Sequence, residues 1–204
     1  MSTKCILFDA DGVVIDSQTF SIQYQKQFGL PDGQILPFFQ NVFPPCLIGQ
    51  ADLKQVIAPY LPGWKWTGTV DEFLQFWFKT EHHLNQPVIS IIKELRNHGI
   101  KCFLVTNQEK YRTEYMKHDM GFNELFDDVY SSSAIGHKKP APEFFHHVLH
   151  DLESKYHIHP TEIMYFDDTK SHIDQARQLG IDAYFYENYD QFFVQVSSLR
   201  QVKK

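Results

Sequence analysis

The chain has 204 residues, of which 43% are hydrophobic and 22% are charged, and its formal net charge is −6. This length suits a single domain that carries a modest insertion, and the hydrophobic content is enough for a packed core. The acidic balance argues against binding to nucleic acid or to a membrane surface, because both require clustered positive charge. An anionic substrate must therefore be met by local positive charge, such as a metal ion and one or two lysines.

Three cysteines, Cys5, Cys46 and Cys102, lie far apart in the sequence. Neither a disulfide framework nor a Cys-x-x-Cys metal site can be drawn from them. Residues 1–8 lack the apolar stretch of a signal peptide, and no window reaches the roughly 20 apolar residues that a membrane-spanning helix needs. We therefore expect a cytoplasmic protein with no obligate protein partner.

An apolar run from Cys5 to Phe8 leads directly into Asp9-Ala10-Asp11-Gly12. A buried strand presents acids in this way at its carboxyl end, where open α/β sheets bind their ligands. Two carboxylates this close repel each other, and a divalent cation with oxygen ligands would offset the repulsion. The alternative is a strand that ends in a common Asp-Gly turn and has no function there.

A different pattern follows, in which helical segments are separated by proline and glycine. The expected helices cover residues 17–28, 34–42, 50–60 and 70–84. We expect them to form a small all-helical cap over residues 17–86, with hinges at Gly29 to Asp32 and at Pro87.

From residue 87 onward, helices and strands alternate. The strands are expected at 100–105, 127–130, 163–166 and 183–186, and the helices at 88–97, 110–119, 143–155, 171–179 and after the last strand. Strands joined by helical crossovers run parallel and are covered on both faces. The predicted fold class is therefore α/β, with a doubly wound, Rossmann-like parallel-sheet core in residues 1–16 and 87–204 that the cap interrupts.

Polar residues follow three of the expected strands directly. They are Asp9 and Asp11, Thr106-Asn107, and Asp167-Asp168, and a fourth cluster, Lys138-Lys139-Pro140, precedes the helix that begins after Pro142. The carboxyl ends of parallel strands share one edge of the sheet, so these clusters should converge. They supply an attacking carboxylate, a second acid, phosphate donors, a lysine and an acid pair for magnesium, which together suit phosphoryl transfer.

These four motifs, in this order, resemble those of the haloacid dehalogenase superfamily of phosphohydrolases. The matching stretches are Phe8-Asp9-Ala10-Asp11-Gly12, Leu104-Val105-Thr106-Asn107, Lys139-Pro140 and Phe166-Asp167-Asp168-Thr169 with the helix that ends at Leu179-Gly180. The gap between the first two motifs is about three times the next gap. The resemblance therefore implies the subgroup with a small helical cap between the first and second motifs, as in the β-phosphoglucomutase-like and phosphatase branch.

The resemblance also implies roles for residues at the sheet edge. Asp9 would be the nucleophile that becomes an aspartyl-phosphate, and Asp11 would protonate the leaving oxygen and then activate water. Thr106 and Asn107 would bind phosphoryl oxygens, and Lys139 would neutralise their charge. Because Lys138 does not directly precede the proline, we interpret it as a solvated neighbour.

For the metal, the resemblance implies Mg²⁺ bound by the Asp9 carboxylate, the Asp11 main-chain carbonyl and Asp168. The fourth motif departs from the commoner family pattern, because Asp167 stands where a glycine is usual and His172 where a later acid is usual. Asp167 could take over the duty of the second acid as a further metal ligand. His172 leaves the ligand set open, and its alternative interpretation is a residue that faces solvent on a helix.

The expected function is a Mg²⁺-dependent phosphatase that hydrolyses a small phosphorylated metabolite. Asp11 favours a phosphoester over an organohalide, because a halide leaving group needs no proton whereas an alkoxide does. One alternative is a sugar-phosphate mutase of the same fold. Another, of a different class, is a non-catalytic phospho-acceptor or regulatory binding domain.

Two further groups of residues invite a functional reading. A histidine cluster, His146, His147 and His150, has helical spacing, but no carboxylate pair completes a metal site there. The expected cap is rich in aromatic residues, namely Trp64, Trp66, Phe73, Phe76, Trp77 and Phe78. We interpret these as the core of the cap rather than as a substrate pocket, because a small helical insert needs aromatics for its own packing.

Overall fold

The computed structural model describes residues 2–16 and 20–201. A five-stranded sheet with the strand order β3-β2-β1-β4-β5 forms its centre, and every neighbouring pair is parallel. The strands are β1 (Cys5–Phe8), β2 (Lys101–Thr106), β3 (Asp128–Ser131), β4 (Ile163–Asp167) and β5 (Asp182–Phe185). This confirms the predicted doubly wound α/β core.

The central strand β1 is apolar along its whole length because both faces of the sheet are covered. All four of its side chains are fully buried. Ile6 and Phe8 pack into the core on one face, and Cys5 and Leu7 pack into the core on the other. A continuous apolar run, rather than an alternating one, is what a doubly covered parallel strand requires.

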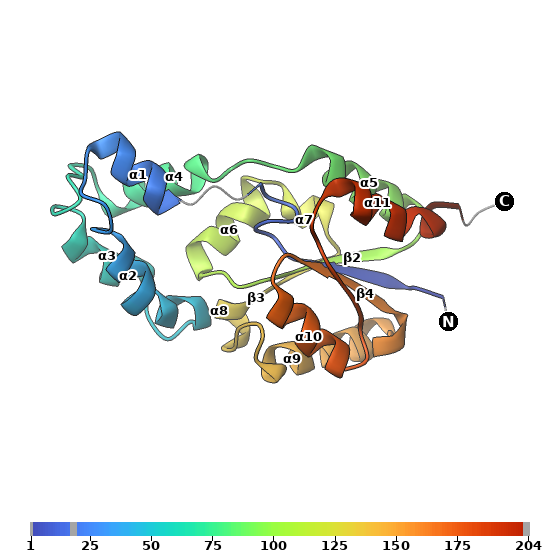
Figure 1. Ribbon diagram of the computed structural model, residues 1–204. Coiled ribbons are helices and arrows are strands. Elements are labelled where there is room, and N and C mark those ends of the chain that lie inside the picture. The colour runs from blue at the N-terminus through green and yellow to red at the C-terminus, as the bar shows by residue number, and fades with distance from the viewer. Residues whose placement is uncertain (1, 17–19, 202–204) are drawn as a thin grey trace.

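Helices cover both faces of the sheet, as Figure 1 shows: α5 and α11 lie on one side, and α9 and α10 on the other. The helical elements of the core are α5 (Gln86–Asn97), α6 (Lys110–His118), α7 (Phe122–Leu125), α8 (Ser132–Ile135), α9 (Pro142–Tyr156), α10 (Lys170–Gln178) and α11 (Tyr189–Val196), with short 3-10 turns at η3 (Pro160–Glu162) and η4 (Ser197–Gln201). No helix in the described ranges is long and apolar enough to cross a bilayer.

The helices that follow β1 gather beside the carboxyl edge of the sheet (Figure 1). They are α1 (Phe20–Phe28), α2 (Leu36–Asn41), η1 (Pro44–Ile48), α3 (Leu53–Ile57), η2 (Ala58–Tyr60) and α4 (Val70–Thr80). A capping box between Thr69 and Glu72 starts α4, whose Phe73, Trp77 and Phe78 are buried. Residues 17–19 of the first predicted helix lie outside the described residues, and the borders of the cap at 16 and 86 remain a prediction.

The two segments that lead into and out of this helical group run side by side. Ile15 forms an antiparallel bridge with Leu84, Asp16 N donates to His83 O at 2.7 Å, and Asn85 N donates to Val14 O at 2.9 Å. The predicted hinge at Gly29 to Asp32 instead lies within the helical group, between α1 and α2. Glycine and proline there mark a turn between helices, which sequence alone does not distinguish from a hinge.

Candidate active site

The strand register places three predicted site residues within one residue of the same level at the sheet edge. Phe8 of β1 aligns with Leu104 of β2 and with Phe166 of β4. Asp9 therefore lies level with Asp167 of β4 and one residue short of Thr106 at the end of β2, and Asp9 N donates to Phe166 O at 2.9 Å. The parallel topology thus brings together acids that are separated by more than 150 positions in the chain.

Lys139 is buried at the centre of this group. Its Nζ lies 2.9 Å from Asp9 Oδ1 and 2.6 Å from Asp167 Oδ2, and it donates to Val105 O at 2.9 Å. Only 1% of Lys139 is exposed, whereas Lys138 is exposed as predicted. Asn107 holds the Lys139 main chain, because its Oδ1 accepts from Lys139 N and its Nδ2 donates to Lys139 O. The phosphate contact predicted for Asn107 stays a prediction.

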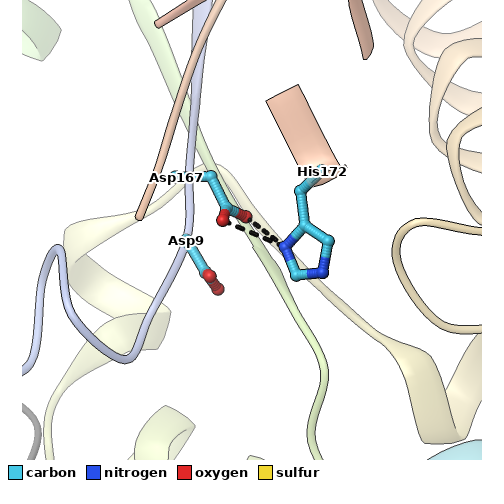
Figure 2. A group of neighbouring side chains, drawn as sticks. All are labelled: Asp9, Asp167 and His172. Atoms are coloured by element: carbon cyan, nitrogen blue, oxygen red, sulfur yellow. Dashed lines mark hydrogen bonds and ion pairs between the residues drawn. The ribbon is translucent and has the colours of Figure 1, made fainter. Parts of the chain in front are cut away.

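Asp167 is surrounded by hydrogen-bond donors. Besides Lys139, Tyr165 Oη donates to its Oδ2, and Thr169 N donates to its Oδ1 at 2.8 Å. His172 Nδ1 lies 3.0 Å from both oxygens, and Figure 2 shows the imidazole ring turned toward the Asp167 carboxylate. His172 is 9% exposed, so the solvent-facing interpretation is wrong: α10 turns this face inward.

Burial and shared charge set the protonation behaviour of this cluster. Burial raises the pKa of Asp9 well above its usual range, Lys139 opposes that shift, and Asp167 adds to it. For Asp167, burial would raise the pKa, but Lys139 and His172 outweigh it and lower the pKa. If both carboxylates ionise around the one lysine, one negative charge is left uncompensated, and a bound cation would offset that charge and favour ionised Asp9.

Asp11 points away from this cluster, toward α6. Arg112 binds its carboxylate in a bidentate ion pair with both N–O distances at 2.8 Å, and Gln108 Nε2 donates to Oδ2. Glu81 Oε2 lies 3.4 Å from Nη2 of Arg112, the same nitrogen that contacts Asp11 Oδ1. Burial would lower the pKa of Arg112, but Asp11 and Glu81 outweigh it and raise the pKa.

Sequence reasoning missed Arg112 and Gln108. Arg112 is one of several charged residues on a predicted helix, so no sequence signal distinguishes it from Lys117 on the same helix. In the structure it is 6% exposed, and its Nε is buried without a hydrogen-bond partner among the described residues.

Asp168 packs against the turn that follows Asp11. Gly12 has a φ of +83°, and a Cβ atom built on it would lie 2.0 Å from Asp168 Oδ2. Only glycine leaves room for the Asp168 carboxylate at this point. The close approach joins the first and fourth motifs, and it explains the glycine in Asp9-Ala10-Asp11-Gly12 by packing as well as by turn geometry.

The donor set at this edge fits a divalent cation with oxygen ligands. Ligand atoms of Asp9, Asp167 and His172 all lie within 4.8 Å of one another, and Figure 2 shows the two carboxylates side by side. Both oxygens of Asp167 already accept from protein donors, and the choice of cation ligands among Asp9, Asp167 and Asp168 stays a prediction. Carboxylate and carbonyl oxygens are the ligands that Mg²⁺ prefers.

The other histidines stand apart from this cluster. His146, His147 and His150 are exposed on α9 and do not belong to the group of metal-ligating atoms found in the described ranges. His82 is half-buried, with Nδ1 3.0 Å from Tyr115 Oη.

A cavity of about 340 Å³ opens beside Asp11, between the cap helices and α6. Asn107, Gln108 and Arg112 line it from the core. Trp77 is 5% exposed and lines it from the cap. Trp64 and Phe73 are buried away from the cavity, as the interpretation of the cap aromatics as core expects. Trp77 belongs to the core of the cap and also lines the cavity.

Comparisons with known proteins agree with this architecture. The family model of haloacid dehalogenase-like hydrolases matches residues 6–185. The chain is 26% identical to a D-ribitol-5-phosphate phosphatase of Bacteroides thetaiotaomicron, over 91% of this chain and 92% of that protein. It is 29% identical to a phosphoglycolate phosphatase of Vibrio vulnificus, over 87% and 80%.

A solved structure has the same fold. It is a HAD family enzyme from Bacteroides thetaiotaomicron in complex with magnesium, with a TM-score of 0.77 and 20% identity. The match covers 95% of this chain and 99% of that one, so it includes the cap as well as the core.

Proposed function

The chain belongs to the haloacid dehalogenase-like hydrolases, and on that premise we propose that it is a Mg²⁺-dependent phosphatase that acts on a small phosphorylated metabolite. The observation that carries this proposal is the buried cluster in which Lys139 lies within 2.9 Å of both Asp9 and Asp167. A buried lysine beside a strand-end carboxylate is suited to hold a transferred phosphoryl group. The two curated relatives described above are both named as phosphatases.

Asp9 is the nucleophile in this proposal. Its Oδ1 accepts from Ala10 N at 2.7 Å and is paired with Lys139, so the carboxylate is fixed in position. Oδ2 attacks phosphorus while the bond from phosphorus to the ester oxygen breaks, and the product is an aspartyl-phosphate. Asp11 gives its proton to the departing alkoxide, which leaves as an alcohol.

Hydrolysis of the aspartyl-phosphate reverses the role of Asp11. As a carboxylate, Asp11 takes a proton from water, and the water oxygen attacks phosphorus. The bond between phosphorus and Asp9 breaks, and inorganic phosphate leaves. Asp11 must swing from Arg112 toward the phosphoryl group for both proton transfers, and the proton that it takes from water is the one that it gives to the leaving oxygen of the next substrate.

Asp9, Asp168 and the main-chain carbonyl of Asp11 would hold the magnesium ion, which supplies positive charge that favours an ionised Asp9 and offsets the charge of the phosphoryl oxygens. Asp167 keeps Lys139 in place, and His172 and Tyr165 in turn hold Asp167. Thr106, which is 1% exposed at the end of β2, is the proposed hydroxyl donor to a phosphoryl oxygen.

The test is release of inorganic phosphate from a panel of sugar, polyol and carboxylic-acid phosphates by the purified protein. We expect turnover with Mg²⁺, none after chelation, and a loss of at least about a thousandfold in kcat for Asp9→Asn. Asp174→Asn, which changes an exposed acid on α10, is the matched control and should retain full activity. Turnover that survives either Asp9→Asn or chelation would contradict the proposal.

A further inference from the structure

The cavity beside Asp11 is built mainly from apolar side chains of the cap. They are Phe20, Leu36, Phe39, Phe43, Leu47 and Trp77. Aromatic rings in this group are in contact. The ring centroids of Phe39 and Trp77 lie 5.3 Å apart edge to face, and those of Phe20 and Trp77 lie 5.1 Å apart in a stacked arrangement. The volume of about 340 Å³ is within the range of small-molecule sites.

Most of the polar side chains that line this cavity already have protein partners, and Ser21 is a further polar residue of the lining. Asp11 is held by Arg112 and Gln108. Glu81 accepts from Trp77 Nε1 at 2.9 Å and from Phe20 N at 3.2 Å. A ligand rich in hydroxyl groups would have to break these bonds or leave its own hydroxyl groups without partners, and both reduce affinity.

The cavity lies beside the residues that would carry out the phosphatase reaction. Asp11, which would protonate the leaving oxygen, is part of its wall, and Asn107 reaches from that wall to the main chain of Lys139. A substrate whose phosphorus faces Asp9 would therefore direct its ester oxygen, and the organic group attached to it, into the space that the aromatic rings enclose.

We infer that the phosphatase prefers monoesters of apolar alcohols, such as alkyl and arylalkyl phosphates, over phosphates of polyols and sugars. The inference rests on the proposed function for the reaction and on the cavity lining for the selectivity. Leu36 is 46% exposed at this cavity, which gives an extended apolar chain a surface to continue along.

The experiment compares hexyl phosphate with sorbitol 6-phosphate. Both are unbranched six-carbon esters of a primary alcohol, and they differ in the hydroxyl groups. We expect kcat/KM with Mg²⁺ to be at least about tenfold higher for hexyl phosphate, because apolar pockets discriminate by about 10–200-fold. Equal or better hydrolysis of sorbitol 6-phosphate would overturn the inference and leave the phosphatase assignment intact.

Two variants test whether this cavity sets the substrate preference. Phe39→Ser should reduce the ratio of the two kcat/KM values about tenfold by adding a hydroxyl group and removing a ring. Trp66→Leu changes a cap aromatic that lies outside the cavity lining, and it should leave the ratio unchanged. A ratio that responds equally to both changes would mean that the preference is not set by this cavity.

A binding measurement separates the two proposals. Calorimetric titration of each ester into Asp9→Asn protein with Mg²⁺ should show hexyl phosphate binding about tenfold more tightly. If wild-type protein hydrolyses neither ester but this binding order holds, the proposed function fails and the apolar site stands. Tighter binding of sorbitol 6-phosphate, or binding of neither ester, would overturn the inference.

Discussion

At the sheet edge, Asp9, Lys139 and Asp167 lie within ion-pair distance in a buried cluster, whereas the cap side of the cavity presents the rings of Phe39 and Trp77. The edge is built from charges that parallel strands bring together, and the cap wall is built from apolar packing. Charged clusters tolerate little change, because removing one partner leaves a buried charge alone. Apolar walls tolerate substitution of similar volume. We therefore expect the chemistry to be confined to the edge and the selectivity to be adjustable in the cap.

Among the variants that compare these two regions for stability, the largest effect is expected for Lys139→Met at the sheet edge. It leaves Asp9 and Asp167 adjacent without a cation, and breaking a buried ion pair of this kind costs about 3–5 kcal/mol. Phosphatase kcat should fall at least about a hundredfold, because the charge that stabilises the phosphoryl oxygens is removed. Lys138→Met, at the exposed neighbour, should change neither the midpoint of urea unfolding nor kcat. Similar losses in both variants would contradict the buried-cluster interpretation.

A smaller effect is expected where the two regions meet, at Arg112. Arg112→Gln removes the bidentate contact with Asp11 and the charge near Glu81. The loss in stability should be about 2 kcal/mol, less than at Lys139, because Gln108 still donates to Asp11. We expect kcat to fall while KM stays near its wild-type value, since Arg112 positions Asp11 rather than the phosphate. Lys117→Gln on the same helix is the control, and an unchanged kcat in Arg112→Gln would remove Arg112 from the proton-transfer machinery.

The smallest effect is expected at Asp52, which connects the cap to α6. Asp52 Oδ2 lies 2.6 Å from Lys110 Nζ and accepts from Tyr111 Oη at 2.9 Å. The hydrogen bond from Lys110 and that from Tyr111 lower the pKa of Asp52 to about 2. Because the pair is partly solvated, Asp52→Asn should cost no more than about 1 kcal/mol.

The pH dependence of the stability difference between wild type and Asp52→Asn follows from the lowered pKa of Asp52. Asp52 contributes stability when it is ionised in both states, above its unfolded pKa of about 4. The contribution is lost as the pH falls toward about 2. The difference in thermal midpoint between wild type and Asp52→Asn should therefore be constant from pH 7 to pH 5 and close between pH 4 and pH 2. A difference that widens on acidification would show that the contact is not an ion pair in the folded state.

The four polar clusters, three at strand ends and one before a helix, show how much could be predicted. Asp9, Thr106 and Asp167 each follow an apolar run, so their placement on one edge follows from the topology of a parallel sheet. The choice between Lys138 and Lys139 rested on the proline that follows, and the burial of Lys139 agrees with it.

By itself, then, the sequence determined the alternation of strands and helices and the residues that end each strand, because local apolar patterns predict both. Only the tertiary structure decided that Asp11 pairs with Arg112, that His172 turns inward onto Asp167, and that Trp77 faces a cavity. Each of these depends on the rotation of a helix and the rotamer of a long side chain relative to a distant element. Such contacts are set by packing between elements, which no local pattern in the sequence specifies.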